Sequence, residues 1–492
     1  MMMNKDKAPL YEALIAHDRL RASAFHVPGH KQRAAWADAR AAAYYESLLA
    51  LDVTELSDTD DLHRPEGPLL EAQRLAAACF GAEETRFLVS GSTAGNLAMI
   101  LAVCLPGELV VVQRNVHKSI LNGLALAGAR AVLLPPDVEE TSGLATVPGA
   151  ELLLRTLRRY PEAKAVILSA PNYYGMSPSL EPLVAIVHER GLPVLVDEAH
   201  GPHFGFHARF PQPALRAGAD LVVQSAHKML SAMTMGAMLH MQGRLVPRAA
   251  VRQALTMVQS SSPSYPIMAS LDLARRQLHV QGEEAFAAAL EAVDRVVDGL
   301  GETRFGALGY GEYAGKGIGY DPLKLVLFDP SGKLGGFELR DALAERNCLA
   351  EMADAKYVVL AFGTGSAAED GARLREALQD ISRTGEIAAG GRSPSKKTIR
   401  PSAGTDAADP RPIRFGRDAY EAEAVPFEQC VGRIAAEWII PYPPGIPALF
   451  PGETITEDIV ERLREWRDGE AHIQGASDPE LRSVLVRREA DG

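Results

Sequence analysis

The sequence predicts an α/β fold with a mostly parallel central sheet that is covered by helices on both faces. Between about residues 85 and 242, short apolar runs alternate with helix-like stretches, and the runs are continuously apolar. Continuous apolar strands joined by helices are what a parallel sheet buried on both faces requires. With 47% hydrophobic and 23% charged residues among 492, the chain can also bury a large core.

The predicted strands follow one another with helical connections. We expect strands at residues 85–90, 108–113, 129–136, 163–170, 219–226 and 236–243, and another in LPVLVDEAHG. Helix-like stretches such as AGNLAMILAVCL and KSILNGLALAGA separate the first strands, and LEPLVAIVHERG ends at Gly191. The binding site of such a sheet is expected beyond the carboxyl ends of its strands.

The chain divides into four predicted segments. Residues 1–300 form an N-terminal segment and the large domain, and residues 301–384 form the first part of a smaller α/β domain. Residues 385–412 are rich in Gly, Pro, Ser and Lys, which is typical of a flexible linker or loop. Residues 413–492 form a C-terminal domain whose Pro-rich stretch, IIPYPPGIPALFPGE (439–453), predicts a rigid loop.

Composition and charge exclude several classes of protein. Lys and Arg total 51 against 63 Asp and Glu, and the net charge of −12 argues against a nucleic-acid binder or an anionic-membrane binder. No window approaches roughly 18 consecutive apolar residues, and the first residues lack the apolar stretch of a secretory signal, so we expect a cytoplasmic protein. The four cysteines lie far apart without CxxC spacing, which indicates neither a disulfide framework nor a metal site.

The segment SGSTAGN, residues 90–96, lies between a predicted strand and a predicted helix. Gly91 and Gly95 allow close backbone approach, while Ser92 and Thr93 place hydroxyls beside the exposed amides of the helix start. That combination binds phosphate. The segment has neither the lysine of a P-loop nor GxGxxG spacing, which disfavours ATP and NAD. A capped helix without a ligand is the alternative.

Three further strand ends carry groups that suit one shared site. Asp197 closes an apolar strand, where it either pairs with an arginine or holds a protonated heterocyclic nitrogen. Lys228, in SAHKML after the next strand, is either a surface lysine or a Schiff-base lysine. His117, in RNVHKS, either caps a helix or stacks on a flat ring. With the phosphate-binding hydroxyls, these groups indicate pyridoxal 5'-phosphate, whose pyridine nitrogen the carboxylate keeps protonated.

At these residues the chain resembles the ornithine/lysine/arginine decarboxylase family of fold-type I enzymes that depend on pyridoxal phosphate. The resemblance runs in family order over residues 7 to about 455. It is carried by FHVPGHK (25–31), DVTELSDTDDLHRPEGPLLEAQ (52–73), SGSTAGN, RNVHKS, DEAHG, SAHK, SSSPSY (260–265) and PYPPGIPALFPGE (441–453). It implies a large domain around a mostly parallel sheet and a smaller C-terminal α/β domain.

The resemblance assigns roles to the residues at the centre of the predicted site. It implies that Lys228 binds the cofactor covalently, that Asp197 pairs with the pyridine nitrogen and that His117 stacks on the ring. Ala199 is expected on the opposite ring face. His200 is expected near the cofactor hydroxyl or the substrate carboxylate, and it completes the four residues predicted to be catalytic.

The resemblance also implies how the phosphate and the second subunit are arranged. Ser92, Thr93 and Ser225 are expected to bind the phosphate, with His227 beside the phosphate and the lysine. The segment SSSPSY looks like the part that reaches the site of a partner subunit, which predicts a homodimer or a dimer of dimers with shared sites. The large enteric relatives carry an N-terminal wing domain; here FHVPGHK begins at residue 25, so we expect the short form and no decamer.

In the segment SSSPSY, Ser262 and Tyr265 are the candidates for residues that reach the site of a partner subunit.

Acidic residues are the candidates for binding a cationic substrate side chain. Glu453, after the Pro-rich loop, is the first choice because prolines hold a carboxylate at a fixed distance from the cofactor. Asp321 in YDPLK and the pair Asp60-Asp61 follow. For each acid the alternative is a solvated side chain or a helix cap.

The residues alone leave the reaction open, because one cofactor supports decarboxylation, transamination, racemisation and elimination. A transaminase usually clamps the α-carboxylate with an arginine, for which Arg64 and Arg114 are candidates. We prefer α-decarboxylation of a basic amino acid: arginine to agmatine first, lysine to cadaverine second and ornithine third. The alternatives are another enzyme with this cofactor, such as an aminotransferase, or a catalytically silent relative with a regulatory role.

Overall fold

The structure is a computed structural model that describes most of the predicted elements. It describes residues 4–309, 313, 317–384, 410–416, 421–441, 445–468 and 472–488. The predicted linker at 385–412 therefore lies outside the described residues up to residue 409, and residues 442–444 of the Pro-rich stretch also lie outside them.

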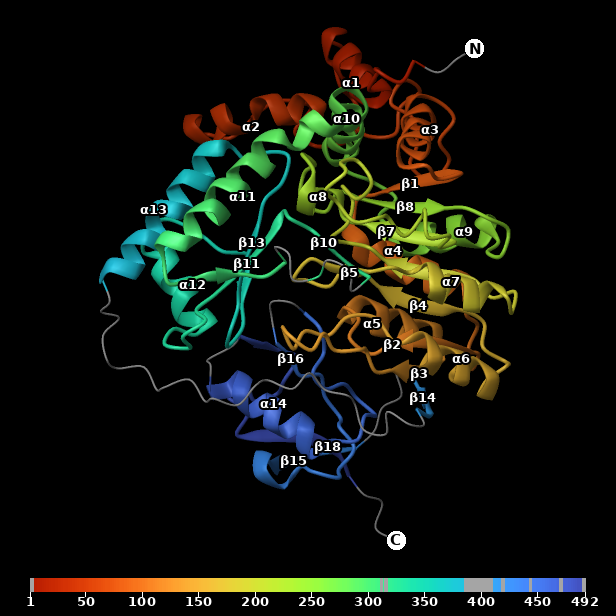
Figure 1. The fold of residues 1–492 in the computed structure, drawn as a ribbon. Coiled ribbons are helices and arrows are strands. Elements are labelled where there is room, and N and C mark those ends of the chain that lie inside the picture. Colours follow the sequence, from red (N-terminus) through yellow and green to blue (C-terminus); the bar gives the residue numbers. More distant parts are fainter. Residues whose placement is uncertain are drawn as a thin grey trace.

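An eight-stranded sheet forms the centre of the fold (Figure 1). Its strand order is β1-β8-β7-β6-β4-β2-β3-β14; the strands from β7 to β3 run parallel, and β1, β8 and β14 pair in antiparallel fashion. The strands are β1 (Glu84–Leu88), β2 (Leu109–Gln113), β3 (Arg130–Leu134), β4 (Val166–Ser169), β6 (Val194–Asp197), β7 (Leu221–Gln224), β8 (Ala237–Met241) and β14 (Pro412–Arg414). The predicted α/β class with a mostly parallel sheet is confirmed.

Helices cover both faces of this sheet because its strands are apolar on both sides. Val110 and Val112 pack with α4, α5 and α9 on one face, whereas Val111 between them packs with α6 and α7 on the other. These helices are α4 (Gly91–Val103), α5 (Lys118–Ala127), α6 (Ala150–Arg159), α7 (Glu181–His188) and α9 (Arg248–Val258). Helix α4 can approach closely because it carries Gly95, where a Cβ atom would lie 2.9 Å from Val223.

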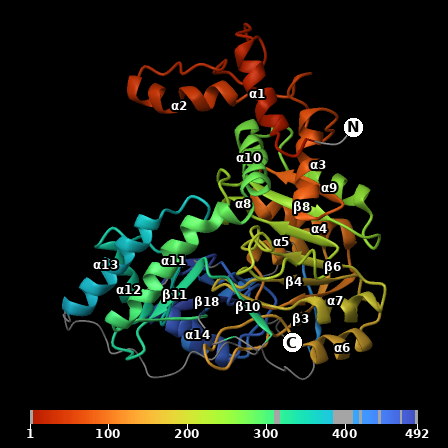
Figure 2. The same ribbon diagram turned by 45° about the horizontal axis from the view of Figure 1, so that its top comes forward.

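The N-terminal helices lie at one end of the molecule, and Figure 2 shows α2 projecting beyond the rest. Helices α1 and α3 pack with α10 and the β1–β8 pair through one large apolar core. The helices of this end are α1 (Pro9–Arg19), α2 (Ala39–Leu51), α3 (Pro68–Phe80), α8 (Ala226–Met229) and α10 (Tyr265–Gln281). Phe25 and Tyr44 of the projecting region are 94% and 84% exposed, which leaves this end with an uncovered aromatic surface.

A smaller antiparallel sheet with strand order β12-β13-β11-β9 packs beside the large one. The two units are joined where β10 pairs with β5 in the segment that follows β4. The elements of this region are β5 (Met176–Pro178), η1 (Gly282–Phe286), α11 (Ala287–Gly299), η2 (Leu300–Glu302), β9 (Gly306–Ala307), β10 (Ile318–Tyr320), β11 (Lys324–Phe328), α12 (Gly336–Ala344), β12 (Met352–Ala353), β13 (Val358–Ala361) and α13 (Ala368–Thr384).

The C-terminal segment first adds β14 to the edge of the large sheet and then forms a unit with its own apolar core. In this unit β15 pairs with β18 and β16 pairs with β17, in antiparallel fashion. Its elements are β15 (Ala422–Pro426), η3 (Phe427–Gln429), β16 (Ile440–Pro441), α14 (Glu457–Asp468), β17 (Ile473–Gln474) and β18 (Ser483–Arg487).

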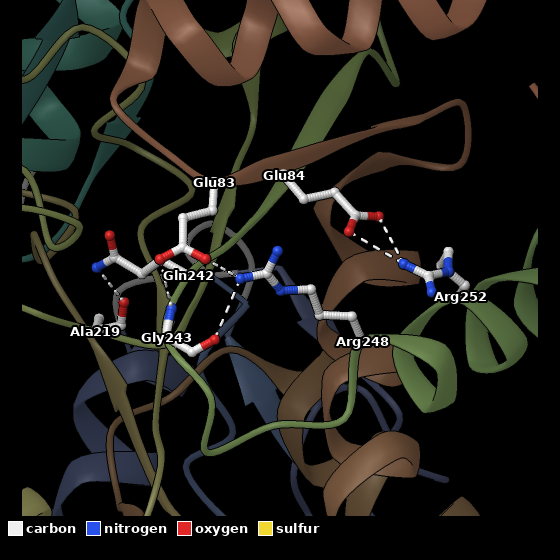
Figure 3. A network of polar contacts seen from close by, with 7 residues as sticks. All are labelled: Glu83, Glu84, Ala219, Gln242, Gly243, Arg248 and Arg252. Atoms are coloured by element: carbon white, nitrogen blue, oxygen red, sulfur yellow. Dashed lines mark hydrogen bonds and ion pairs between the residues drawn. The ribbon is translucent and has the colours of Figure 1, made fainter.

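Ion pairs fasten α9 to the antiparallel edge of the large sheet (Figure 3). Arg248 binds the carboxylate of Glu83, and it also donates to the carbonyl of Gly243 at 3.2 Å. One turn further along, Arg252 Nη1 lies 3.1 Å from both carboxylate oxygens of Glu84. These exposed pairs hold the helix that covers α4, away from the predicted site.

No helix among the described residues has the length and apolar character needed to cross a membrane. No group of three or more His, Cys, Asp and Glu side chains in the same part of the chain is arranged to hold a metal ion.

Candidate active site

The predicted site residues meet at the carboxyl ends of the strands of the large sheet. Asp197 is the last residue of β6, Ser225 follows β7, and His117 follows β2 as the N-cap of α5. Ser92 and Thr93 lie in the first turn of α4, directly after β1. Strand β1 runs in the same direction as β7, since both are antiparallel to β8. All these residues therefore lie at the carboxyl ends of strands that point in the same direction.

The start of α4 and Ser225 offer groups that could hold a phosphate. Gly91 has φ of +71°, a left-handed conformation that glycine adopts without strain, and it turns the chain from β1 into the helix. The amides of the first helical turn have no acceptor within the helix and can bind an anion. The side chain of Ser225 is 1% exposed, and its Oγ atom has no hydrogen-bond partner among the described residues. A phosphate oxygen would satisfy this buried hydroxyl.

Asp197 is a buried carboxylate that is held by neutral donors. Its Oδ2 atom accepts a hydrogen bond from Asn96 at 2.8 Å, and Oδ1 accepts one from the amide of Ala199 at 3.2 Å. Burial raises the pKa of Asp197, whereas the charge of Lys228 and these two hydrogen bonds lower it. No cation in the described ranges forms an ion pair with the carboxylate, so a protonated pyridine nitrogen would supply the missing counter-charge.

Lys228 and His200 are in direct contact beside this carboxylate. The Nζ atom of Lys228 lies 2.8 Å from Nε2 of His200, and the ring of Tyr173 lies 4.5 Å from the His200 ring. Burial lowers the pKa of Lys228 to about 8, while the charge of Asp197 opposes that shift. Burial and the charge of Lys228 also lower the pKa of His200. His200 is therefore neutral, and its Nε2 atom accepts the hydrogen bond from the lysine.

His117 is a neutral ring in a defined tautomer. Its Nδ1 atom accepts a hydrogen bond from the amide of Ser119 at 3.2 Å and lies 2.8 Å from the hydroxyl of the same residue. Because Nδ1 accepts, the ring proton lies on Nε2. Burial, followed by the charges of Lys228 and Lys118, lowers the pKa of His117 to about 4. The hydroxyl of Ser119 in turn accepts a hydrogen bond from Asn96 at 2.8 Å.

Ala199 and His227 line the space between these groups. Ala199 is 9% exposed, and its carbonyl accepts a hydrogen bond from the amide of Ser225 at 3.3 Å. It therefore connects the turn that follows Asp197 to Ser225. The amide of His227 donates to the carbonyl of Gly236 at 3.1 Å. Burial and the charge of the neighbouring lysine lower the pKa of His227.

The segment SSSPSY lies at the start of α10, where it contacts the N-terminal region of its own chain. Tyr265 is fully buried, and its hydroxyl donates to the carbonyl of Asp60. The His63 Nε2 atom lies 2.9 Å from the carbonyl oxygen of Ser260. Ser262, by contrast, is exposed. The tyrosine is therefore anchored within one chain, and the serine faces outward.

Glu453, the first-choice acid for the substrate side chain, is engaged by Arg114. Nε and Nη2 of Arg114 donate to the two carboxylate oxygens at 2.9 and 2.8 Å, and both side chains are largely buried. Burial raises the pKa of Glu453, and the adjacent guanidinium lowers it. A substrate could bind Glu453 only if Arg114 released it.

The other acids predicted from the sequence also have partners in the protein. Asp321 is fully buried, with Oδ1 3.0 Å from Nε2 of His203. Asp60 accepts hydrogen bonds from several backbone amides around the start of α3, and Asp61 accepts one from the amide of His63 at 2.7 Å. The arginine Arg64 is 85% exposed and pairs with a nearby surface glutamate. Neither Arg64 nor the paired Arg114 is free inside the site.

Five residues that we did not predict belong to this neighbourhood: Asn96, Ser119, Tyr173, Lys324 and Glu351. The first two lie inside the motifs SGSTAGN and RNVHKS, so the sequence contained them but their hydrogen bonds depend on folding. Tyr173 follows β4 closely, and the rule that sites lie at carboxyl strand ends could have identified it. Lys324 is the first residue of β11 and the last of YDPLK, and Glu351 directly precedes β12; neither residue was given a role from the sequence.

The geometry fits pyridoxal phosphate and defines a class of enzyme. Within the described residues, a buried hydroxyl without a hydrogen-bond partner lies near a helix start, and a buried carboxylate forms no ion pair. A lysine with a lowered pKa lies beside a neutral histidine. Such groups suit the phosphate, the pyridine nitrogen and the aldehyde carbon of this cofactor. The fold and the site thus define an enzyme that depends on pyridoxal phosphate.

Comparisons with known proteins identify the family. The family model described as Orn/Lys/Arg decarboxylase, major domain, matches residues 8–301, and the model of the C-terminal domain of that family matches residues 410–491. The uncharacterized protein YaaO of Bacillus subtilis is 39% identical over 485 residues, which cover 97% of this chain and 98% of that protein. The arginine decarboxylase of Bacillus subtilis is 33% identical over 492 residues, which cover 99% of each.

A solved structure agrees with the fold. Lysine decarboxylase A from Pseudomonas aeruginosa superposes with a TM-score of 0.80 at 21% identity, covering 98% of this chain and 80% of that chain. The chain belongs to the Orn/Lys/Arg decarboxylase family, and it is an amino-acid decarboxylase with pyridoxal phosphate as its cofactor. The predicted family, enzyme class and cofactor are confirmed.

Proposed function

We propose that this decarboxylase acts on the α-carboxylate of arginine and forms agmatine, with lysine as its second substrate and ornithine as its third. The observation that carries decarboxylation over transamination is the pairing of Arg114 with Glu453. A transaminase clamps the substrate carboxylate with an arginine, and this buried arginine is committed to an internal carboxylate. The full-length similarity to a protein named arginine decarboxylase supports arginine as the first substrate.

The residues of the site have complementary roles in this proposal. Bound pyridoxal phosphate supplies an electron sink for the electron pair that is left when the bond from the α-carbon to its carboxylate breaks and carbon dioxide leaves. Asp197 would hold the pyridine nitrogen and keep it protonated, and His117 would stack on the ring. Lys228, whose pKa is lowered to about 8, holds a proton that it can give to the α-carbon, while His200 orients its amine.

We further propose a homodimer with shared active sites, in the cytoplasm. Aromatic side chains at the N-terminal end support the dimer, since Phe25 and Tyr44 are almost fully exposed to solvent in the isolated chain. A groove of about 680 Å³ lies nearby, with Trp36, Tyr45 and Pro266 among the residues that line it. Four free cysteines are compatible with a reducing compartment.

One experiment tests the reaction and the substrate order. The purified protein, loaded with pyridoxal phosphate, is incubated separately with arginine, lysine and ornithine. Carbon dioxide release and the identity of the amine are measured by mass spectrometry. We expect agmatine to form with the highest kcat/KM. A keto acid in place of an amine would identify an aminotransferase, and the absence of any product would favour the silent relative.

A further inference from the structure

Lys324 is a buried amine at the junction of the two sheets. It is the first residue of β11 in the smaller sheet, and it is 2% exposed. Gly175, in the loop after β4 of the large sheet, lies so close that a Cβ atom there would be 2.8 Å from the Cβ atom of Lys324. The same loop carries Tyr173, whose ring faces His200. Lys324 therefore lies beside the catalytic end of the large sheet.

The charge of Lys324 acts on one side of the site. Burial and then the charges of Lys228 and Lys324 lower the pKa of His200, and Lys324 also lowers the pKa of Lys228. The Nζ atom of Lys228 lies 5.7 Å from the centre of the Tyr173 ring, and Gly175 of the same loop packs against Lys324. Lys324 therefore contacts the loop whose tyrosine faces both Lys228 and His200.

The Lys324 side chain is 2% exposed, and within the described residues its Nζ atom forms no hydrogen bond and no ion pair. The nearby acid Asp321 has its Oδ1 atom 3.0 Å from Nε2 of His203. Burial lowers the pKa of Lys324, and the charges of the exposed Glu351 and of Asp321 raise it. A buried ammonium without a paired anion is strongly unfavourable. An anion that arrives with the substrate would relieve that penalty.

We propose that Lys324 binds the α-carboxylate of the amino-acid substrate. The inference rests on the proposed function, in which the substrate nitrogen takes the place of the Lys228 amine at the cofactor. The α-carboxylate is two bonds from that nitrogen, so its partner must lie near the Lys228 amine, and Lys324 packs against the loop whose Tyr173 ring faces that amine. A held carboxylate fixes the rotation of the α-carbon, and this rotation decides which bond is broken.

The test compares ligands that differ only in the carboxylate. The wild-type enzyme and the variants Lys324→Met and Lys324→Arg are loaded with cofactor, and ligand binding is followed by the absorbance of the cofactor. Arginine binding is measured by rapid mixing, and agmatine binding is measured at equilibrium. Lysine with cadaverine and ornithine with putrescine are measured in the same way. The affinity of each apoprotein for pyridoxal phosphate and its melting temperature are recorded. Lys164→Met, which removes a half-exposed lysine, is the matched control.

We expect Lys324→Met to weaken arginine binding roughly tenfold to a hundredfold, since a charged hydrogen bond of about 1.5 to 3 kcal/mol is lost. Binding of agmatine and of the cofactor should change by less than about twofold. Lys324→Arg should recover part of the affinity for the amino acid. Equal weakening of arginine and agmatine, or weaker cofactor binding alone, would overturn the proposal. If the wild-type enzyme binds amino acids without decarboxylating them, the proposed reaction fails, and the comparison with the amines still decides the role of Lys324.

Discussion

Asn96 donates a hydrogen bond from Nδ2 to the Oδ2 atom of Asp197 over 2.8 Å, and the same amide group reaches the hydroxyl of Ser119. Ser119 in turn supports His117. Asp197, the last residue of β6, and His117, the N-cap of α5, are therefore linked through one buried donor, Asn96, with Ser119 between it and the histidine.

Asp197→Asn should retain cofactor but lose most of its turnover. A neutral amide cannot keep the pyridine nitrogen protonated while negative charge develops at the α-carbon, so the electron sink is weakened. Cofactor content from absorbance and kcat with the preferred substrate are the measurements. Asn96→Ala, which removes the shared donor and keeps the carboxylate, should reduce kcat less. Turnover of Asp197→Asn near the wild-type value would show that the acid is structural.

Lys228→Ala should lose turnover by several orders of magnitude, where each factor of ten corresponds to about 1.4 kcal/mol of barrier. Reduction of the wild-type enzyme with borohydride should attach the cofactor to Lys228, which peptide mass spectrometry can locate. The control is Lys164→Ala, at a half-exposed lysine paired with Glu108. Attachment of the cofactor to another lysine would reject the assignment of the site.

His117→Asn should lower activity modestly and remove a pH dependence of stability. Asparagine preserves an acceptor for the N-cap of α5, but it cannot stack on the ring, a loss of about 0.5 to 1.5 kcal/mol or roughly twofold to tenfold in rate. The pKa of His117 is about 4 in the folded protein, below its ordinary value near 6.5. Between these values the unfolded chain takes up a proton that the folded protein does not.

The stability contributed by neutral His117 is therefore present above about pH 6.5 and is lost as the pH falls toward 4, by about 1.4 kcal/mol for each pH unit. Urea unfolding at several pH values between 4 and 7 measures this slope for the wild-type protein and for His117→Asn. The wild-type protein should show the steeper loss toward acid. Parallel curves for the two proteins would mean that His117 is protonated equally in the folded and unfolded states.

The parallel core of the fold was predictable because its strands are apolar without interruption. Val110, Val111 and Val112 face alternate sides of the sheet, yet all are buried, so helices must cover both faces. The direction of β8 was not predictable in the same way. Its apolar run looks like the others, but it pairs antiparallel with both β7 and β1. Strand direction depends on the path of the connection, which periodicity does not record.

In the candidate site, too, the residues marked by local sequence were predictable, and the contacts that depend on folding were not. Asp197 and Ser225 were predictable because they follow apolar strands, and such strand ends share one edge of a parallel sheet. The hydrogen bonds of Asn96 were not predictable, because they join it to residues 23 and 101 positions away. Lys324 begins a strand and resembles a solvated lysine in sequence; only the packing of the smaller sheet against the loop at Gly175 buries it.

Two inactive proteins should restore activity when they form mixed dimers. Lys228→Ala lacks the catalytic amine, and Ser262→Trp fills an exposed position in the segment expected to reach the partner subunit. In a random mixed dimer one of the two sites combines both intact parts, so about a quarter of the wild-type activity should return. Subunit exchange is verified with one tagged protein. Full exchange without recovery would show that each site is built within one chain.

Glu453→Leu should destabilise the fold. Glu453 binds Arg114 through both carboxylate oxygens, and Arg114 also donates to the carbonyls of Pro447 and Ala448 at 3.0 and 3.2 Å. The pair thus ties the Pro-rich stretch to the residue that follows β2, close to His117. Removal of one partner leaves a largely buried charge unpaired, which costs about 3 to 5 kcal/mol. Urea unfolding measures the loss.

Two further proteins separate this structural role from substrate binding by Glu453. The double variant Arg114→Met with Glu453→Leu removes both charges and should recover most of the stability, since apolar side chains of similar size can replace a buried ion pair. Glu453→Gln keeps the shape of the side chain. If Glu453 instead bound the guanidinium of arginine, Glu453→Gln would lose roughly tenfold to a hundredfold in kcat/KM at nearly unchanged stability. The bidentate contact with Arg114 leads us to expect the opposite result, a loss of stability with a KM for arginine close to the wild-type value.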